Sequence, residues 1–332
     1  MARGASLFLS RGARAVALAA LGLTTVLLFG LGTFEAVGHS PWLLPLPLAA
    51  LGLLALGVVR ETRAAWGEPP VRSQAMAAAV LDGVAVTGAA LVTYGVSVGF
   101  GLGPVLASGF VGLAGAMLAP KRAVAIYCGS FVGMASPEAF ESVAGVGLSG
   151  AVAGGLFALS ERCFTGLGGR LGAVAFVGSL ASALLHGAAL HSQPVPAWDI
   201  GLPVVACAVA AAALTDFLNV RMGHGPVLAS AFVGVAAALL LPAMHGELGS
   251  TLAVVAFCAS FVGMSSRGRL PNAFWAAMAG LVCGVMFLFT TPWLGGAGGK
   301  LGTLAFGSTI ACWQAADLMT RIRERGAAAR RP

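Results

Sequence analysis

Two short phrases that contain small polar residues each occur twice in this chain. The phrase CGSFVGMAS at 128–136 returns as CASFVGMSS at 258–266, and GGRLGAVAF at 168–176 returns as GGKLGTLAF at 298–306. Hydroxyl groups both donate and accept hydrogen bonds, and glycines placed before a helix leave backbone N–H groups open to a ligand. The residue types therefore favour binding of a small polar solute.

The first phrase combines serines with glycines in a segment that is apolar for only about 14 residues, which is too short for a hydrocarbon core of about 30 Å. Short, glycine-interrupted segments at matching positions of two halves point to a substrate site in membrane transporters. The alternative is helix packing, in which small residues allow close approach and serine bonds back to its own helix. The predicted pathway residues of this phrase are Ser130, Gly133, Ser136, Ser260, Gly263 and Ser266.

The second phrase places two glycines and a cation directly before an apolar segment. Exposed N–H groups, the positive end of a helix dipole and a basic side chain together form a predicted anion site. The alternative is that the cations extend to lipid headgroups. The predicted pathway residues of this phrase are Gly168, Gly169, Arg170, Gly298, Gly299 and Lys300.

Two aspartates lie inside apolar segments, where ionisable groups are costly and are functional candidates. Asp82 and Asp216 are therefore candidates for proton or sodium coupling. Neither aspartate is duplicated, which argues against a symmetric cation site. For Asp216, the alternative is an ion pair with Arg221, about one turn away along the chain.

Composition indicates an integral membrane protein of the all-α class. The chain has 332 residues, of which 58% are hydrophobic and 9% are charged, whereas soluble domains carry about 25% charged residues. The net charge of +7 comes from tails and short loops, so we expect it to orient the chain in a bilayer rather than to bind nucleic acid. The six scattered cysteines predict neither a disulfide framework nor a zinc site, and no cofactor is expected.

About twelve apolar stretches are candidate transmembrane segments. They lie near 16–34, 42–59, 75–98, 103–119, 123–136, 143–159, 171–185, 200–220, 226–242, 252–265, 274–291 and 301–317. We interpret the first as a transmembrane helix rather than a signal peptide, because it is long enough to span.

With both termini in the cytoplasm, alternation puts nearly all basic loop residues inside, as the positive-inside rule requires, and Lys300 is the exception. The predicted location is the inner (plasma) membrane. The loops predicted to lie outside hold His39, Glu138, Glu141, His186, His191, Asp199, His245 and Glu247.

The paired phrases belong to a longer duplication, which includes GPVLASGFVG at 103–112 and GPVLASAFVG at 225–234. We divide the chain into two leading helices with a basic N-terminus (1–74), repeat unit 1 (75–185), repeat unit 2 (197–316) and a basic cytoplasmic tail (317–332). Each unit holds five segments, and because five is odd, the second unit enters the membrane from the opposite face. Such inverted repeats are typical of secondary transporters and several channels.

An enzymatic alternative comes from GLSG at 147–150, which resembles the GxSG nucleophile motif of rhomboid intramembrane proteases. The resemblance implies Ser149 as the nucleophile of an intramembrane serine hydrolase, with His186 or His191 as its base. It covers about nine residues of a glycine-rich chain.

The sequence as a whole therefore predicts a non-enzymatic transporter or channel for a small polar solute. An anionic or neutral solute is preferred to a cationic one, because buried carboxylates are scarce. The expected partners are an inorganic ion or small-molecule solute and the lipid bilayer, and a homo-oligomer is an alternative to a monomer.

Overall fold

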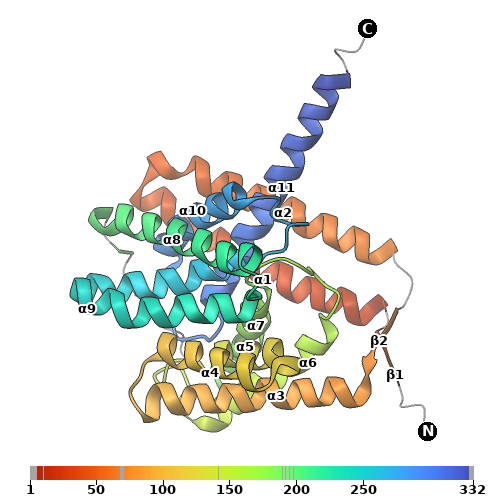
Figure 1. Cartoon of the computed structure of the whole chain (residues 1–332), viewed down its shortest axis with the longest axis vertical. Coiled ribbons are helices and arrows are strands. Elements are labelled where there is room, and N and C mark those ends of the chain that lie inside the picture. The colour runs from red at the N-terminus through yellow and green to blue at the C-terminus, as the bar shows by residue number, and fades with distance from the viewer. Residues whose placement is uncertain are drawn as a thin grey trace.

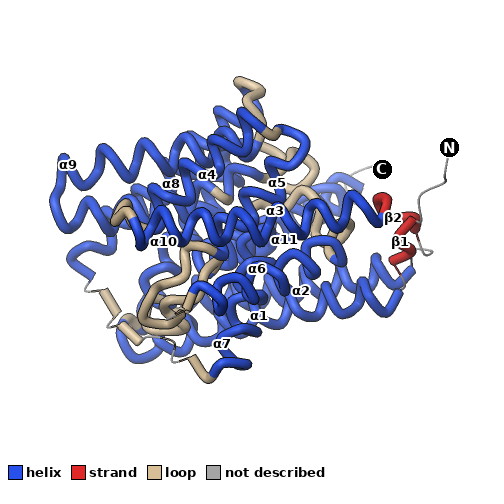
Figure 2. The backbone as a smooth tube through the Cα atoms, turned by 90° about the horizontal axis from the view of Figure 1, so that it is seen from below, coloured by secondary structure: helices blue, strands red, loops and turns tan. Residues whose placement is uncertain are grey.

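The computed structural model describes all residues except 1–5, 10, 68–70, 141, 189, 191, 194, 197 and 329–332. Glu141 and His191 lie outside the described residues. The described part of the chain is a helical bundle, and two short strands, β1 (Ser6–Leu9) and β2 (Val71–Ala75), pair antiparallel at one end of it (Figure 2). The expected helical class is therefore confirmed, and this strand pair is an addition that the sequence did not indicate.

The helices follow one another along the chain. The two leading helices are α1 (Arg11–His39) and α2 (Pro45–Gly67). The next five are α3 (Met76–Tyr94), α4 (Pro104–Leu118), α5 (Ala123–Val132), α6 (Val143–Leu159) and α7 (Arg170–His186). The last four are α8 (Gly201–Asp216), α9 (Pro226–Ser260), α10 (Ala273–Thr290) and α11 (Lys300–Ala328).

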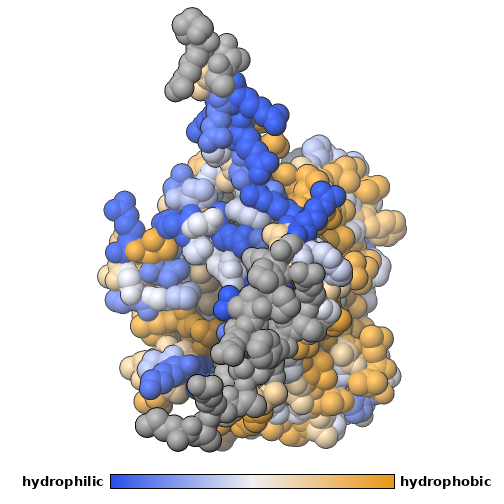
Figure 3. All heavy atoms as spheres, turned by 90° about the vertical axis from the view of Figure 1, so that its right-hand side faces the viewer, coloured by the Kyte–Doolittle hydropathy of each residue, from blue (hydrophilic) through white to orange (hydrophobic). Residues whose placement is uncertain are grey.

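The distribution of side chains is that of an α-helical membrane protein. Six helical segments of the described residues are long and apolar enough to cross a membrane, and α4, α6 and α7 are shorter apolar helices. Large apolar side chains such as Leu118 and Leu184 are 84% exposed, whereas serine hydroxyls such as those of Ser108 and Ser179 are fully buried. Lipid rather than water suits such an exterior, and apolar atoms cover much of the surface in Figure 3.

Helix α9 consists of two arms that lie side by side (Figure 1). The sequence predicts separate segments here, and the structure joins them through Gly246, whose φ of 57° and ψ of −128° interrupt the helix. A Cβ atom at Gly234 in the first arm would overlap the ring of Phe257 in the second. The hairpin of α4 and α5 has the same packing, because a Cβ at Gly112 would overlap the ring of Tyr127.

The two duplicated stretches also share their irregular backbone. A π-helical turn follows α3 at Gly95–Gly99, and another follows α8 at Phe217–Arg221. Five positions with positive φ recur at matching places, including the unusual non-glycine pair Phe164 and Leu294. The complete matched set is Gly101, Gly103, Phe164, Gly166 and Gly169 with Gly223, Gly225, Leu294, Gly296 and Gly299.

The two stretches meet at a backbone contact between α7 and α11. A Cβ at Gly172 would overlap the Cα of Gly302, and a Cβ at Gly302 would overlap that of Gly172. Glycine is required at both positions, because any side chain would separate the helices. This contact fixes the starts of α7 and α11 beside each other.

Candidate functional site

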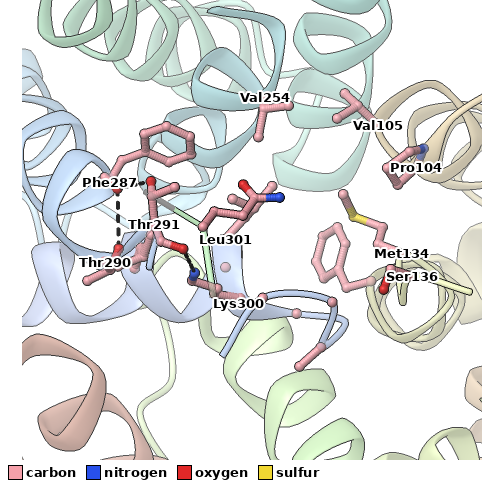
Figure 4. A pocket seen from close by; sticks show the side chains of 18 of the residues that line it. Pro104, Val105, Met134, Ser136, Val254, Phe287, Thr290, Thr291, Lys300 and Leu301 are labelled. Carbon is pink, nitrogen blue, oxygen red and sulfur yellow. Dashed lines mark hydrogen bonds between the residues drawn. The ribbon is translucent and has the colours of Figure 1, made fainter. Parts of the chain in front are cut away.

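The larger of two related cavities lies at the start of α11 and has a volume of about 310 Å³ (Figure 4). Helix α4 also begins at this cavity, so that two helix N-termini meet there. The first N–H groups of a helix lack partners within the helix and attract negative charge. The polar residues that line it are Ser136, Gln193, Thr290, Thr291 and Lys300.

Lys300 is the only charged side chain among the described residues that line this cavity. Its Nζ donates a hydrogen bond to the Thr291 carbonyl at 3.2 Å, and an ammonium group has three N–H donors. Thr290 and Thr291 donate their hydroxyl protons to carbonyls of α10, at 2.7 and 2.8 Å. Both threonine hydroxyls are thus satisfied by carbonyls of α10, while Lys300 supplies donors.

The smaller cavity has a volume of about 170 Å³ and lies where α7 and α9 begin. Arg170 lines it together with Gly168 and Gly169. The Nη1 atom of Arg170 donates to the carbonyls of Ser160 at 2.7 Å and Cys163 at 3.2 Å. These bonds hold the guanidinium group in place at the edge of the cavity.

The two cavities are lined by matching residues of the duplicated phrases. Each contains the start of a GPV phrase, the methionine of an SFVGM phrase, and the glycine, cation and leucine of a GG(R/K)L phrase. The matching pairs are Pro104 and Pro226, Val105 and Val227, Met134 and Met264, Gly299 and Gly169, Lys300 and Arg170, and Leu301 and Leu171. No carboxylate lies among the described residues that line either cavity.

A cluster of four aromatic rings adjoins both cavities through Phe131. Phe131 lines both of them, and its ring centroid lies 4.4 Å from that of Tyr127, 4.7 Å from Phe261 and 6.1 Å from Phe257. All four side chains are at most 1% exposed. The two cavities therefore share an apolar, closely packed neighbour.

Pairs of hydrogen-bonded serine hydroxyls lie beside this cluster. Ser260 donates to the Phe257 carbonyl at 2.7 Å and must therefore accept from Ser230, which lies at 2.8 Å. Ser230 in turn accepts from the Tyr127 hydroxyl at 2.9 Å. In the other copy, Ser108 and Ser130 form the matching pair at 2.9 Å. Phe257 stands where the first copy has Tyr127, so only one pair receives a third hydroxyl.

The predicted pathway serines and glycines of the first phrase take two different places. Ser130 and Ser260 are fully buried in the hydroxyl pairs and are not among the residues that line the cavities. Gly133 and Gly263 lie against the backbones of α3 and α8, where a Cβ would overlap main-chain atoms. These contacts agree with the packing alternative, and a role in the pathway stays a prediction.

Ser136 and Ser266 connect the two copies through matching hydrogen bonds. The Ser136 N–H donates to the Gly296 carbonyl, and the Ser266 N–H donates to the Gly166 carbonyl, both at 2.9 Å. Gly298, like Gly168, packs against carbonyls of the other copy's SFVGM phrase. The second phrase of each copy thus lies on the first phrase of the other copy.

Both candidate coupling aspartates form ion pairs and are not among the residues that line the cavities. Asp82 pairs with Arg122. Asp216, the last residue of α8, pairs at 2.9 Å with Arg267 in the turn between α9 and α10, whereas the sequence suggested Arg221. Among the described residues, no three side chains of the metal-binding types lie close enough to hold a metal ion.

The Ser149 hydroxyl has a structural partner. It is fully buried and donates to the Gly145 carbonyl at 2.9 Å, as the Ser182 hydroxyl does from α7. The Nδ1 atom of His186 lies 3.0 Å from the Ser182 carbonyl. Ser149 and His186 thus each contact a backbone carbonyl, and the hydrolase alternative stays a prediction.

Sequence reasoning missed the aromatic cluster. Phe131 and Phe261 belong to the duplicated SFVGM phrases, so the duplication itself is the signal that could have identified them. Comparison with protein-family models, with curated proteins and with solved structures finds no match to this chain.

Proposed function

We propose that this protein is a transporter or channel for a small polar solute, with a path between two inversely oriented repeats. Its proposed setting is the inner (plasma) membrane, with about twelve crossings and both termini in the cytoplasm. An anionic or neutral solute is favoured over a cation. The bilayer and the solute are its proposed partners, and copies of the chain can assemble as a homo-oligomer.

Contacts at the two ends of the bundle support this topology. Arg269 binds Glu61 and donates to the Thr165 carbonyl at 2.9 Å, which joins two loops and the end of α2 that alternation assigns to the cytoplasmic side. Ser136, at the outer end of segment 123–136, is joined by a backbone hydrogen bond to Gly296, in a loop assigned to the outer side. Chain segments with one predicted location thus contact each other.

The matched pair of cavities is the observation that carries the proposal. A permeation path between inverted repeats needs equivalent entrances from the two sides, with the narrowest point between the copies. The two cavities have equivalent linings and share Phe131. The aromatic cluster is then the closed centre of the path.

Charge favours an anionic or neutral solute over a cation. Each cavity holds one cation, Lys300 or Arg170, together with two helix N-termini. In a site of low dielectric constant these groups attract negative charge and repel cations. A neutral solute with carbonyl groups can also bind, because the lysine donates hydrogen bonds.

The test is flux through purified protein reconstituted in liposomes, with inorganic anions, small organic acids, neutral amides and small cations as solutes. We expect at least one anion or amide to cross and to raise the melting temperature of the protein, because binding to the native state stabilises it. If no solute of the panel crosses or shifts the melting temperature, or if only cations do, the proposal is wrong.

Lys300→Met adds a test of the site, with Lys121→Met as its control. Lys121 is an exposed lysine that is not among the residues lining either cavity. A hydrogen bond to a charged group contributes about 1.5–3 kcal/mol, so anion binding should weaken about tenfold or more in Lys300→Met. It should be unchanged in Lys121→Met, and equal effects of the two changes would exclude the larger cavity as the binding site.

A further inference from the structure

The last three turns of α11, residues 317–328, extend beyond the bundle; we call them the tail helix. Asp317 fixes its start, because its carboxylate lies 2.8 Å from both Arg60 of α2 and Arg321. Figure 3 views the molecule from the end where the N-terminal strands lie, and the tail helix extends upward past the outline of the bundle. Figure 1 shows the same segment standing away from the other helices.

One side of the tail helix is apolar, and the described residues of the bundle cover it only in part. Leu318, Met319 and Ile322 are 51%, 44% and 60% exposed. Residues spaced in this way lie on one face of a helix. Three large apolar side chains on one face of a projecting helix need a covering surface if they are not to face water.

The charged residues are arranged around this apolar strip. At about 100° per residue, Arg321 and Arg325 fall along one border of the strip and Arg323 falls along the other. Thr320 and Glu324 fall on the opposite side of the helix. The basic residues therefore flank the apolar side chains, and the acidic residue is turned away from them.

We propose that the tail helix lies on the membrane surface and binds anionic phospholipid headgroups, with its apolar strip inserted among the acyl chains. Interfacial helices have an apolar face bordered by basic residues, whose long side chains reach the phosphates. A basic segment next to a transmembrane helix is attracted to anionic lipid. A second copy of the chain fits less well, because strips placed face to face would bring arginines opposite arginines. The inference does not depend on solute passage.

The test compares Ile322→Cys in the apolar strip with Thr320→Cys on the opposite face, each carrying a fluorescent label on the full-length protein. The vesicles contain phosphatidylcholine alone or mixed with phosphatidylglycerol, and some acyl chains are brominated to quench the label. With phosphatidylglycerol, we expect quenching at position 322 to exceed that at position 320 several-fold. Labelled protein without either substitution measures the background from native cysteines.

A charge variant tests the role of the arginines. With Arg321, Arg323 and Arg325 all replaced by glutamine, the effect of phosphatidylglycerol on position 322 should disappear. Equal quenching at both positions, or quenching that is independent of phosphatidylglycerol, would overturn the proposal. Protection of position 322 that increases with the protein-to-lipid ratio would overturn it in favour of contact between copies.

Discussion

Replacing Phe131 with alanine should open a path between the two cavities. Phe131 is the only side chain that lines both cavities among the described residues, and it is 1% exposed. Its ring contacts the three other rings of the cluster. In Phe131→Ala, the linings of the two cavities, of about 310 and 170 Å³, no longer have a shared aromatic ring.

The expected increase in flux follows from the hydrogen bonds that a solute loses when it passes the aromatic rings. Each unsatisfied polar group costs about 1–3 kcal/mol, and space left by the ring admits water to satisfy such groups. Lowering the barrier by about 1.4–3 kcal/mol raises the rate about ten- to a hundredfold. The same change should lower the free energy of unfolding by about 3–5 kcal/mol, because a buried ring is removed.

Flux into liposomes and thermal unfolding measure the two effects separately. Phe29→Ala is the matched control, because Phe29 is fully buried against Gly307 of α11 and is not among the residues lining either cavity. We expect Phe29→Ala to lose comparable stability with no gain in flux. Flux at the wild-type rate through folded Phe131→Ala protein would refute the assignment of the aromatic cluster as the barrier.

Three further changes test other contacts. Tyr127→Phe removes only the first hydroxyl of the hydrogen-bond chain Tyr127–Ser230–Ser260 and should lower the free energy of unfolding by about 1 kcal/mol. Ser260→Ala leaves the buried Ser230 donor without an acceptor and should lower it by about 1–3 kcal/mol. Denaturant titration would show the reverse order if the donor directions are wrong. Gly298→Ala should lower the free energy of unfolding by about 3 kcal/mol in the same assay, because the new Cβ would overlap two carbonyl oxygens. Wild-type stability of this variant would show that the two backbone segments can move apart. Asp216→Asn should lower the free energy of unfolding by about 1–3 kcal/mol, since the partner Arg267 is partly exposed. The pH dependence of flux should not change, and an altered pH profile would instead indicate ion coupling by Asp216.

The sequence predicts the elements that depend on local residue types. The starts of α7 and α11 follow from two glycines before an apolar run, and both Gly169 and Gly299 do have positive φ. The sequence also gives the approximate bounds of most helices. It separates the two arms of α9, but it does not show that Gly246 joins them through a single interruption.

Contacts between segments that are far apart in the sequence cannot be predicted from local residue patterns. Arg267 lies far along the chain from Asp216, so helical spacing favoured the nearer Arg221 instead. The aromatic cluster was missed for a similar reason, because a phenylalanine in an apolar segment has the same pattern whether it faces lipid, a core or a cavity. Only the packing of the α5 hairpin against the α9 hairpin brings Phe131 and Phe261 together.

The contact between Gly172 and Gly302 has a mechanical consequence for the whole molecule. The close contact continues along the first turns of both helices, because a Cβ at Gly169 would also overlap Phe306 and a Cβ at Gly299 would overlap Phe176. Backbones that touch along such a stretch without side chains between them cannot slide along each other without a clash. The helix starts that carry Arg170 and Lys300 are therefore held to each other as one unit.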